Sequence, residues 1–407
     1  MKIVFLTCPG YGFTNTTKLF IKHLVDMRNT VYYFSSIQYA SHMEDTGCEF
    51  ISYKDCFEEY QVEKSSEYDT FYSVKNALNQ SISQWKAQKK VIESVQEIIR
   101  NIEPDVILHD SCMYSGKYIS RVLGIKAVAV FATIPISGGY LKQGNSYYAN
   151  NYFHFAPILG AKDRDNAVKK FKRYFESYLD KIHPIPDYFE VFQSTEDFNL
   201  VFSPRLIIPY EQMYDERYCF ISPFLYKSEK KGRIKVDKPN IYISFGTSWT
   251  PQKKLIENFY KQLGDYEANI IFSFGGKLSE SVCGIPPKNF QVSNFVDQRA
   301  VLEKTDIYIG SGGMTSVYEV IEYDIPMILI PFAQADHYII AEQVEKNGCG
   351  VTLDFHNLEF VNLKLELDKV LCNSKYKRNV KKLHHKMIQP DGITDAIEMM
   401  LKYLKGH

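Results

Sequence analysis

Residues 306–350, DIYIGSGGMTSVYEVIEYDIPMILIPFAQADHYIIAEQVEKNGCG, have the pattern of a strand, a glycine turn, a helix, a second strand, a polar loop and a second helix. That order is typical of a parallel α/β sheet, in which ligands bind at the carboxyl ends of the strands. The apolar strand at 307–309 runs into Ser311, Gly312 and Gly313, where glycine lets the backbone come close to a ligand. The helix that follows begins with unpaired amide hydrogens, which favour an anion such as phosphate.

Polar side chains follow both strands of this segment. On the helix, three residues spaced by three share one face: Gly313, Ser316 and Glu319. The second strand, at 327–331, is followed by Asp336 and His337. Together these groups suit a phosphate, a ribose and a sugar. From the glycines and the spacing alone, an ordinary α/β turn with a capped helix is an equal alternative.

The same segment resembles the donor-binding signature of the GT1 glycosyltransferases, especially the bacterial macrolide glycosyltransferase group. That signature runs His-Gly-Gly, Ser, Glu, Gly-Val-Pro, Pro, Asp-Gln and a closing Gly-x-Gly. Residues 324–326 fill the Gly-Val-Pro slot, Pro331 and Asp336 fall at the expected distances, and residues 348–350 close the block. The resemblance covers most of the chain and is lost only over about residues 137–200.

The resemblance implies a GT-B fold, in which two Rossmann-like, doubly wound parallel-sheet domains face a cleft. Strand and helix patterns alternate in both halves of the chain, as this fold requires. We expect an acceptor-binding domain at 1–225, a charged linker at 226–239 and a nucleotide-sugar-binding domain at 240–388. A last helix, at 389–407, is expected to pack back on the first domain.

The resemblance also assigns roles to residues on the donor side. In the family, an aromatic ring stacks on the nucleotide base, a role for Phe295 unless its ring fills the core, and Gln298 would reach the base or ribose. Glu319 would accept both ribose hydroxyls, and Asp336 would hold sugar hydroxyls. The full expected set is Thr247, Phe295, Gln298, Ser311, Gly312, Gly313, Ser316, Glu319, Asp336 and His337. His337 replaces the family's more usual Gln, so the sugar stays open.

Two positions depart from the family's catalytic pattern. Phe13, between Gly12 and Asn15 on the acceptor side, occupies the slot of the general-base histidine, and phenylalanine cannot take a proton. Asp110 stands where the family has the aspartate that orients this histidine, which makes it the candidate catalytic residue. Ser311 replaces the His of His-Gly-Gly and brings no positive charge to the leaving group.

These departures leave two hypotheses. The first is an inverting glycosyltransferase that moves a hexose from a UDP- or dTDP-sugar to a small natural-product or lipophilic acceptor. A missing base costs an alcohol acceptor ~10²–10⁴-fold, so the acceptor is then a phenol, carboxylate, phosphate or thiol, or Asp110 itself takes the proton. The second is a catalytically impaired relative that binds a nucleotide or a partner as an auxiliary.

Composition agrees with a two-domain cytoplasmic enzyme. A chain of 407 residues with 45% hydrophobic residues is too long for one core. Lys plus Arg and Asp plus Glu both number 48, so no net charge points to nucleic acid as a partner. The eight cysteines form no Cys-x-x-Cys pair, which favours reduced thiols. No cluster has metal-ligand spacing, so we expect no metal and no cofactor besides the donor substrate.

Membrane contact is expected at most at the surface. No apolar run approaches the eighteen residues of a span, and the apolar start is too short for a secretory signal. Residues 165–180 carry a basic run that is either a solvated helix face or a peripheral contact with an acidic membrane. The sequence does not predict the oligomeric state.

Overall fold

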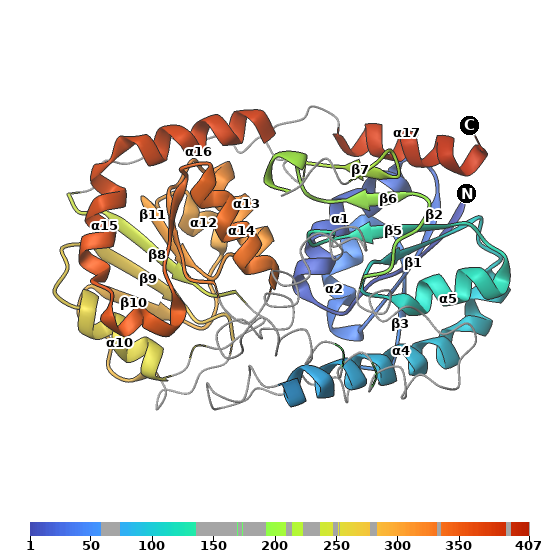
Figure 1. Ribbon diagram of the computed structural model, residues 1–407. Coiled ribbons are helices and arrows are strands. Elements are labelled where there is room, and N and C mark those ends of the chain that lie inside the picture. The colour runs from blue at the N-terminus through green and yellow to red at the C-terminus, as the bar shows by residue number, and fades with distance from the viewer. Residues whose placement is uncertain are drawn as a thin grey trace. The chain divides into compact units, whose positions relative to one another are not determined.

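The computed structural model places most of the chain in two compact units (Figure 1). It describes residues 1–57, 74–135, 169, 173, 193–208, 214–222, 237–246, 251, 253–276, 283–331, 335–387 and 392–406, with backbone alone at 74–82, 335 and 356. The first unit comprises Met1–Pro223 and Pro390–His407, and the second comprises Phe224–Gln389. Most of the expected linker at 226–239 and of the basic run at 165–180 lies outside the described residues.

The first unit is built on a seven-stranded parallel sheet with the order β3-β2-β1-β4-β5-β6-β7. The strands are β1 (Lys2–Leu6), β2 (Thr30–Ser35), β3 (Glu49–Ser52), β4 (Val106–Asp110), β5 (Ala127–Phe131), β6 (Asn199–Val201) and β7 (Tyr218–Phe220). The strand order reverses between β1 and β4. The carboxyl ends of these two strands therefore form a topological switch point, which is where open α/β sheets bind ligands.

Helices cover both faces of this sheet. They are α1 (Tyr11–Asp26), the short α2 (Ala40–Met43), α4 (Val74–Ile102), α5 (Tyr114–Leu123) and α17 (Gly392–Lys405). Helix α1 buries Phe20, Ile21 and Leu24, whose three- and four-residue spacing puts them on one face. Helix α17 contacts α1 and β7, and α4 contacts α5. Figure 1 shows α17 and α4 on opposite sides of the sheet, as a doubly wound unit requires.

The last helix is tied to the first unit by specific contacts. The Lys126 Nζ donates to the Leu404 carbonyl at 2.9 Å, and the Phe198 and Tyr403 rings stack with centroids 5.3 Å apart. Met400, on the inner face of α17, is fully buried. The chain after the second unit thus completes the core of the first one.

The second unit has a six-stranded parallel sheet with the order β10-β9-β8-β11-β12-β13. Its strands are β8 (Asn240–Ser244), β9 (Asn269–Ser273), β10 (Phe290–Ser293), β11 (Ile307–Gly310), β12 (Met327–Leu329) and β13 (Gly350–Thr352). The order reverses between β8 and β11, so their carboxyl ends form a second switch point. The edge strands β7 and β13 are each three residues long, and our patterns did not predict them.

The helices of the second unit connect these strands. They are α10 (Lys253–Leu263), α12 (Gln298–Leu302), α13 (Met314–Glu322), α14 (Ala335–Lys346), α15 (Leu363–Cys372) and α16 (Ser374–Met387). Helix α13 contacts α12, α14 and α16, and α10 contacts α15. Asp297 caps α12, because its side chain accepts a hydrogen bond from the Ala300 amide at 3.2 Å. This cap fixes the start of the helix that carries Gln298.

Candidate functional site

The glycine turn after β11 lies against His337 in the first turn of α14. Gly312 has φ +91, and a Cβ built on it would lie 2.8 Å from the His337 carbonyl oxygen. A Cβ on Gly313 would lie 3.5 Å from His337 Nε2. His337 is buried, and Asp336 lies beside it in the first turn of α14, where the helix dipole favours a carboxylate. The structure therefore brings together the predicted phosphate turn and the predicted sugar-binding pair.

The close approach at Gly312 makes alanine costly there. We expect Gly312→Ala to lower the free energy of unfolding by about 2–3 kcal/mol, because it adds a left-handed backbone penalty and a backbone clash. Gly246 is the matched control: it has φ +79, but no atom of the described residues lies within 4 Å of a Cβ built on it. Gly246→Ala should cost only the backbone penalty, about 1–2 kcal/mol. Urea unfolding would measure both, and equal losses would contradict the clash.

Gln298 and Glu319 form the central contact of the expected donor site. The Gln298 Nε2 donates to Glu319 Oε2, while Gln298 Oε1 accepts from the buried Tyr242 hydroxyl at 3.1 Å. Burial raises the pKa of Glu319, and the hydrogen bond from Gln298 partly offsets this. Among the described residues no donor reaches Glu319 Oε1. The network thus orients the carboxylate and leaves one oxygen for a ligand hydroxyl.

Two further donor-side residues, Phe295 and Ser311, follow the carboxyl ends of strands β10 and β11 of the second sheet. The Phe295 ring is 66% exposed, so it does not fill the core and has a face for a base. Ser311 is buried, with its hydroxyl 3.5 Å from the Phe245 carbonyl, and Ser316 is half-buried on α13. Thr247 lies outside the described residues.

Phe13 and its neighbours lie in the first turns of α1, just after β1. Gly12 is exposed, while Phe13 and Asn15 are half-buried. The Phe13 ring packs on Gly10, since a Cβ built on Gly10 would lie 3.0 Å from a ring carbon. The acceptor-side residues of the sequence prediction thus occupy a helix start at the first switch point.

Asp110 ends β4 at the same switch point and is fully buried. Its Oδ2 accepts from the Thr7 hydroxyl at 2.6 Å and from the Cys8 amide at 2.5 Å. Its Oδ1 is buried and has no hydrogen-bond partner in the described part of the chain. Burial raises the pKa of Asp110 to about 7, although the bonds from Thr7 and Cys8 act in the opposite direction. The carboxyl group is thus enclosed and, near neutral pH, only partly ionised.

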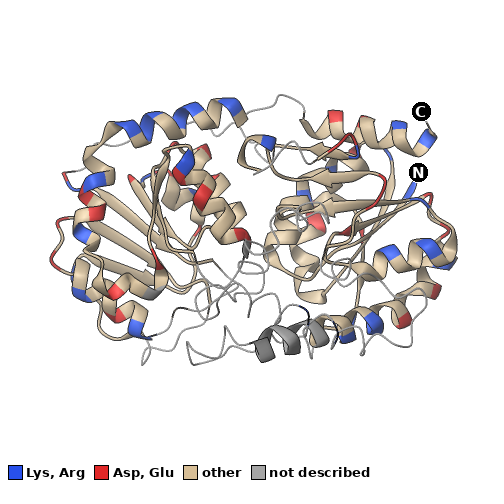
Figure 2. Cartoon of the chain, viewed as in Figure 1, with Lys and Arg blue, Asp and Glu red and all other residues tan. Residues whose placement is uncertain are grey.

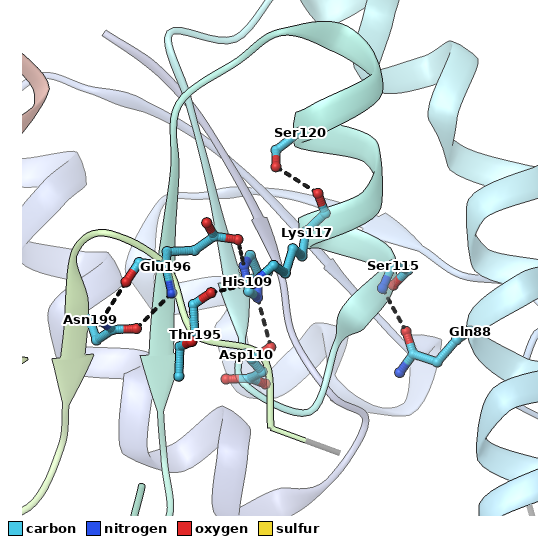
Figure 3. Close-up of polar contacts among 9 residues, drawn as sticks. All are labelled: Gln88, His109, Asp110, Ser115, Lys117, Ser120, Thr195, Glu196 and Asn199. Carbon is cyan, nitrogen blue, oxygen red and sulfur yellow. Dashed lines mark hydrogen bonds and ion pairs between the residues drawn. The ribbon is translucent and has the colours of Figure 1, made fainter. Parts of the chain in front are cut away.

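A buried polar cluster that sequence reasoning missed lies on the other face of β4 (Figure 3). His109 Nδ1 lies 3.0 Å from the Asp110 carbonyl, and His109 Nε2 lies 3.2 Å from Glu196 Oε1. Both partners accept, so a ring protonated on both nitrogens satisfies both contacts. Gly116 makes room for the ring, because a Cβ there would lie 2.4 Å from the His109 Cβ. The alternation along β4 places His109 opposite Asp110 but gives no sign of these partners.

The cluster ties the chain around Glu196 to β4 and α5. The Lys117 ammonium donates to the Thr195 carbonyl, and the Ser194 amide donates to the Ser111 carbonyl at 2.6 Å. Burial acts to raise the pKa of Glu196, but the His109 hydrogen bond and the charges of His109, Lys117 and Arg121 outweigh it and lower the pKa. The described chain that leads into β6 is therefore anchored beside Asp110.

No helix in the described part of the chain has the length and apolar character needed to span a membrane. Within the same residues, no group of three or more His, Cys, Asp or Glu side chains is placed to hold a metal ion.

Comparison with known proteins agrees with this geometry. A family model described as UDP-glucoronosyl and UDP-glucosyl transferase matches residues 231–392. The NDP-glycosyltransferase YjiC of Bacillus subtilis (strain 168) is 24% identical over 99% of this chain and 97% of its own. The oleandomycin glycosyltransferase of Streptomyces antibioticus is 21% identical over 73% of this chain and 67% of its own. The solved structure of the kitacinnamycin glycotransferase superposes with a TM-score of 0.80 at 20% identity, covering 99% of both chains.

Two doubly wound parallel-sheet units and this likeness define a glycosyltransferase of GT-B fold, which confirms the predicted fold and enzyme class. The family-model match and the named relatives place the chain more narrowly. Residues 231–392 match the UDP-glycosyltransferase family model, and relatives that are similar over most of the chain are glycosyltransferases, as the resemblance to the GT1 family predicted.

Proposed function

We propose that this protein is an inverting glycosyltransferase that moves a hexose from a UDP- or dTDP-sugar to a lipophilic small molecule with an acidic acceptor group. The observation that carries the donor half is the Tyr242–Gln298–Glu319 network, in which one carboxylate oxygen has no donor among the described residues. The enclosed Asp110, at the same switch point as Phe13, carries the acceptor half. The eight cysteines are free thiols, which supports a cytoplasmic location.

On the donor side, each part of a nucleotide-sugar has a counterpart. The exposed Phe295 ring suits the base, and Glu319 suits the ribose hydroxyls. The unpaired amides at the start of α13 suit the diphosphate and stabilise it as it leaves. Asp336, on the first turn of α14, suits the sugar hydroxyls. The family model names UDP-sugars, and the YjiC relative is an NDP-glycosyltransferase, which agrees with a nucleotide donor.

On the acceptor side, we propose an acidic nucleophile, such as a phenol or carboxylate. Its oxyanion would form the new bond to the anomeric carbon as the bond to the diphosphate breaks, and the electron pair would leave on the nucleoside diphosphate. Such an acceptor needs no strong base. This suits a site where Phe13 cannot take a proton and the Asp110 carboxyl is fully buried. The alternative, in which Asp110 is the base, would require its unpartnered Oδ1 to become accessible.

The same two residues also favour a second candidate, an auxiliary protein that binds the nucleotide without turnover. The two candidates share the donor site and differ only in chemistry. Release of nucleoside diphosphate with a panel of phenolic and carboxylic acceptors separates them. Nucleotide binding without any release in this panel would favour the auxiliary.

Glu319→Gln tests the donor site. We expect calorimetric titration to show saturable binding of UDP or dTDP by the wild type, and binding about 10–100-fold weaker by the variant. A charge-assisted hydrogen bond to the ribose is lost in the variant, although the side chain keeps its shape.

Glu257→Gln, on the exposed face of α10, is the matched control and should bind like the wild type. A parallel titration with GDP tests which nucleobase the site prefers. Equal affinity in the Glu319 variant would place the ribose elsewhere, and no binding of any nucleotide by the wild type would contradict the donor site itself.

A further inference from the structure

The outer face of α16 is strongly basic. This helix of 14 residues contains six Lys or Arg residues and no Asp or Glu, whereas the whole chain has 48 of each sign. All six side chains are exposed: Lys375, Lys377, Arg378, Lys381, Lys382 and Lys386. Figure 2 shows them as successive blue turns along the helix. The charge of this face is therefore a local feature, and it does not follow from the composition.

The opposite face of α16 holds the helix in a fixed rotation. Val380, Leu383 and Met387 are buried, and α16 contacts α13 and α15. The His384 Nδ1 lies 2.7 Å from Asp324 Oδ1, and the Asn379 Nδ2 donates to the Gly348 carbonyl at 3.1 Å. At about 100° per residue, the basic side chains spread over the side opposite these contacts. The cations are thus presented on one rigid surface.

Four other helices of this protein pair lysines with their own acidic residues. Ion pairs three or four residues apart occur within α4, α10, α14 and α15: Lys89 with Glu93, Lys253 with Glu257, Lys346 with Glu342, and Lys369 with Glu366. Helix α16 has no acidic residue that could do this. No acidic residue of α16 itself therefore offsets this positive charge, and such a charged face attracts a surface of opposite charge.

We infer that α16 docks the protein on a bilayer that contains anionic phospholipids. The helix is about 21 Å long, and its cations lie along one side of it over this length. They can therefore contact a flat layer of negatively charged headgroups together. The exposed residues of α16 include no Phe, Tyr or Trp, the rings on which proteins stack the bases of single-stranded nucleic acid. They include no large apolar residue that would insert into the hydrocarbon either. Binding is hence electrostatic and confined to the membrane surface.

A vesicle sedimentation experiment tests the inference. The full chain is mixed with vesicles of phosphatidylcholine, with and without phosphatidylglycerol, at low salt. We expect binding only to the anionic vesicles, and its loss near 1 M salt, where the Debye length falls to about 3 Å. A variant with Lys375, Lys381, Lys382 and Lys386 changed to Gln should bind at least about 50-fold more weakly, since each basic residue near a membrane contributes on the order of fivefold.

The matched control carries the same loss of charge elsewhere on the second unit: Lys253, Lys254, Lys261 and Lys304 changed to Gln. Gln has nearly the helix propensity of Lys, so both variants should keep the fold, which circular dichroism checks. Absence of wild-type binding, or equal losses in both variants, would overturn the inference. Binding of duplex or single-stranded nucleic acid without vesicle binding would overturn it in favour of a nucleic-acid partner. No donor or acceptor is present, so the outcome is independent of the proposed transferase activity.

Discussion

Replacing Phe13 by histidine is expected to raise the turnover of alcohol acceptors by about 10²–10⁴-fold, the usual contribution of a positioned general base. The family resemblance implies that Phe13 occupies the slot of the general-base histidine, and the structure places Phe13 half-buried in the first turns of α1 at the first switch point. Asp110 has a buried Oδ1 without a partner in the described residues, which is free to accept from a new imidazole. The variant would thereby regain both the base and the group that orients it.

The gain should depend on the acidity of the acceptor. Phenols and carboxylic acids of low pKa need little help from a base, so their turnover should change by less than about tenfold. Phe13→Ala is the size control and should not raise alcohol turnover. Adding Asp110→Asn to Phe13→His should remove most of the gain. If Phe13→His does not raise the turnover of alcohol acceptors while the donor still binds, the Asp110 carboxyl does not act as the partner of a histidine at position 13.

Asp110→Asn is expected to reshape the pH dependence of stability. The pKa of Asp110 is raised from 3.8 to about 7 by burial, so the folded protein holds this proton more tightly than the unfolded chain. Its contribution is fully present below pH 3.8, is lost as the pH rises towards 7, and is constant above that. A pKa shift of this size corresponds to about 4 kcal/mol of stability that the wild type loses as the Asp110 carboxyl ionises. The neutral amide of Asn does not ionise, so the variant does not lose this stability. Relative to the wild type, the variant should gain about this much between pH 4 and pH 8 in urea unfolding.

Glu196→Gln is a control for which the stability contribution should depend on pH in the opposite direction. Because the pKa of Glu196 is lowered in the folded protein, its contribution is present above the unfolded value of 4.5 and is lost as the pH falls through the folded value. This variant should therefore be less stable than the wild type at neutral pH, and the difference should shrink in acid.

A constant stability difference between Asp110→Asn and the wild type from pH 4 to pH 8 would show that Asp110 is not held protonated by the fold. Turnover of Asp110→Asn on a phenol within about tenfold of the wild type would exclude Asp110 as the base.

The local order of elements was accessible from the sequence because it depends on short-range patterns. The apolar run at 307–309, the glycines after it and the period of the next helix predict β11, the turn and α13, and the structure confirms them. The edge strands β7 and β13 were not predicted, whereas β12, which has the same length of three residues, was predicted as part of the longer run at 327–331. The family resemblance named Gln298 and Glu319 separately and gave no indication that one amide hydrogen-bonds the other carboxylate.

By itself, the sequence predicted the alternation of strands and helices from its periodicity, and the resemblance of its motifs to the GT1 family implied the GT-B fold and the residues expected at each switch point. Only the tertiary structure decided the environments of those residues. The burial of Asp110 depends on contacts from Thr7 and Cys8, more than a hundred positions away. His109 lies next to Glu196, which is 87 positions away in the sequence. The basic residues of α16 share an outer face because Val380, Leu383 and Met387 are buried on the opposite side of the helix. Desolvation and long-range pairing set charge and pKa, and neither leaves a pattern in the local sequence.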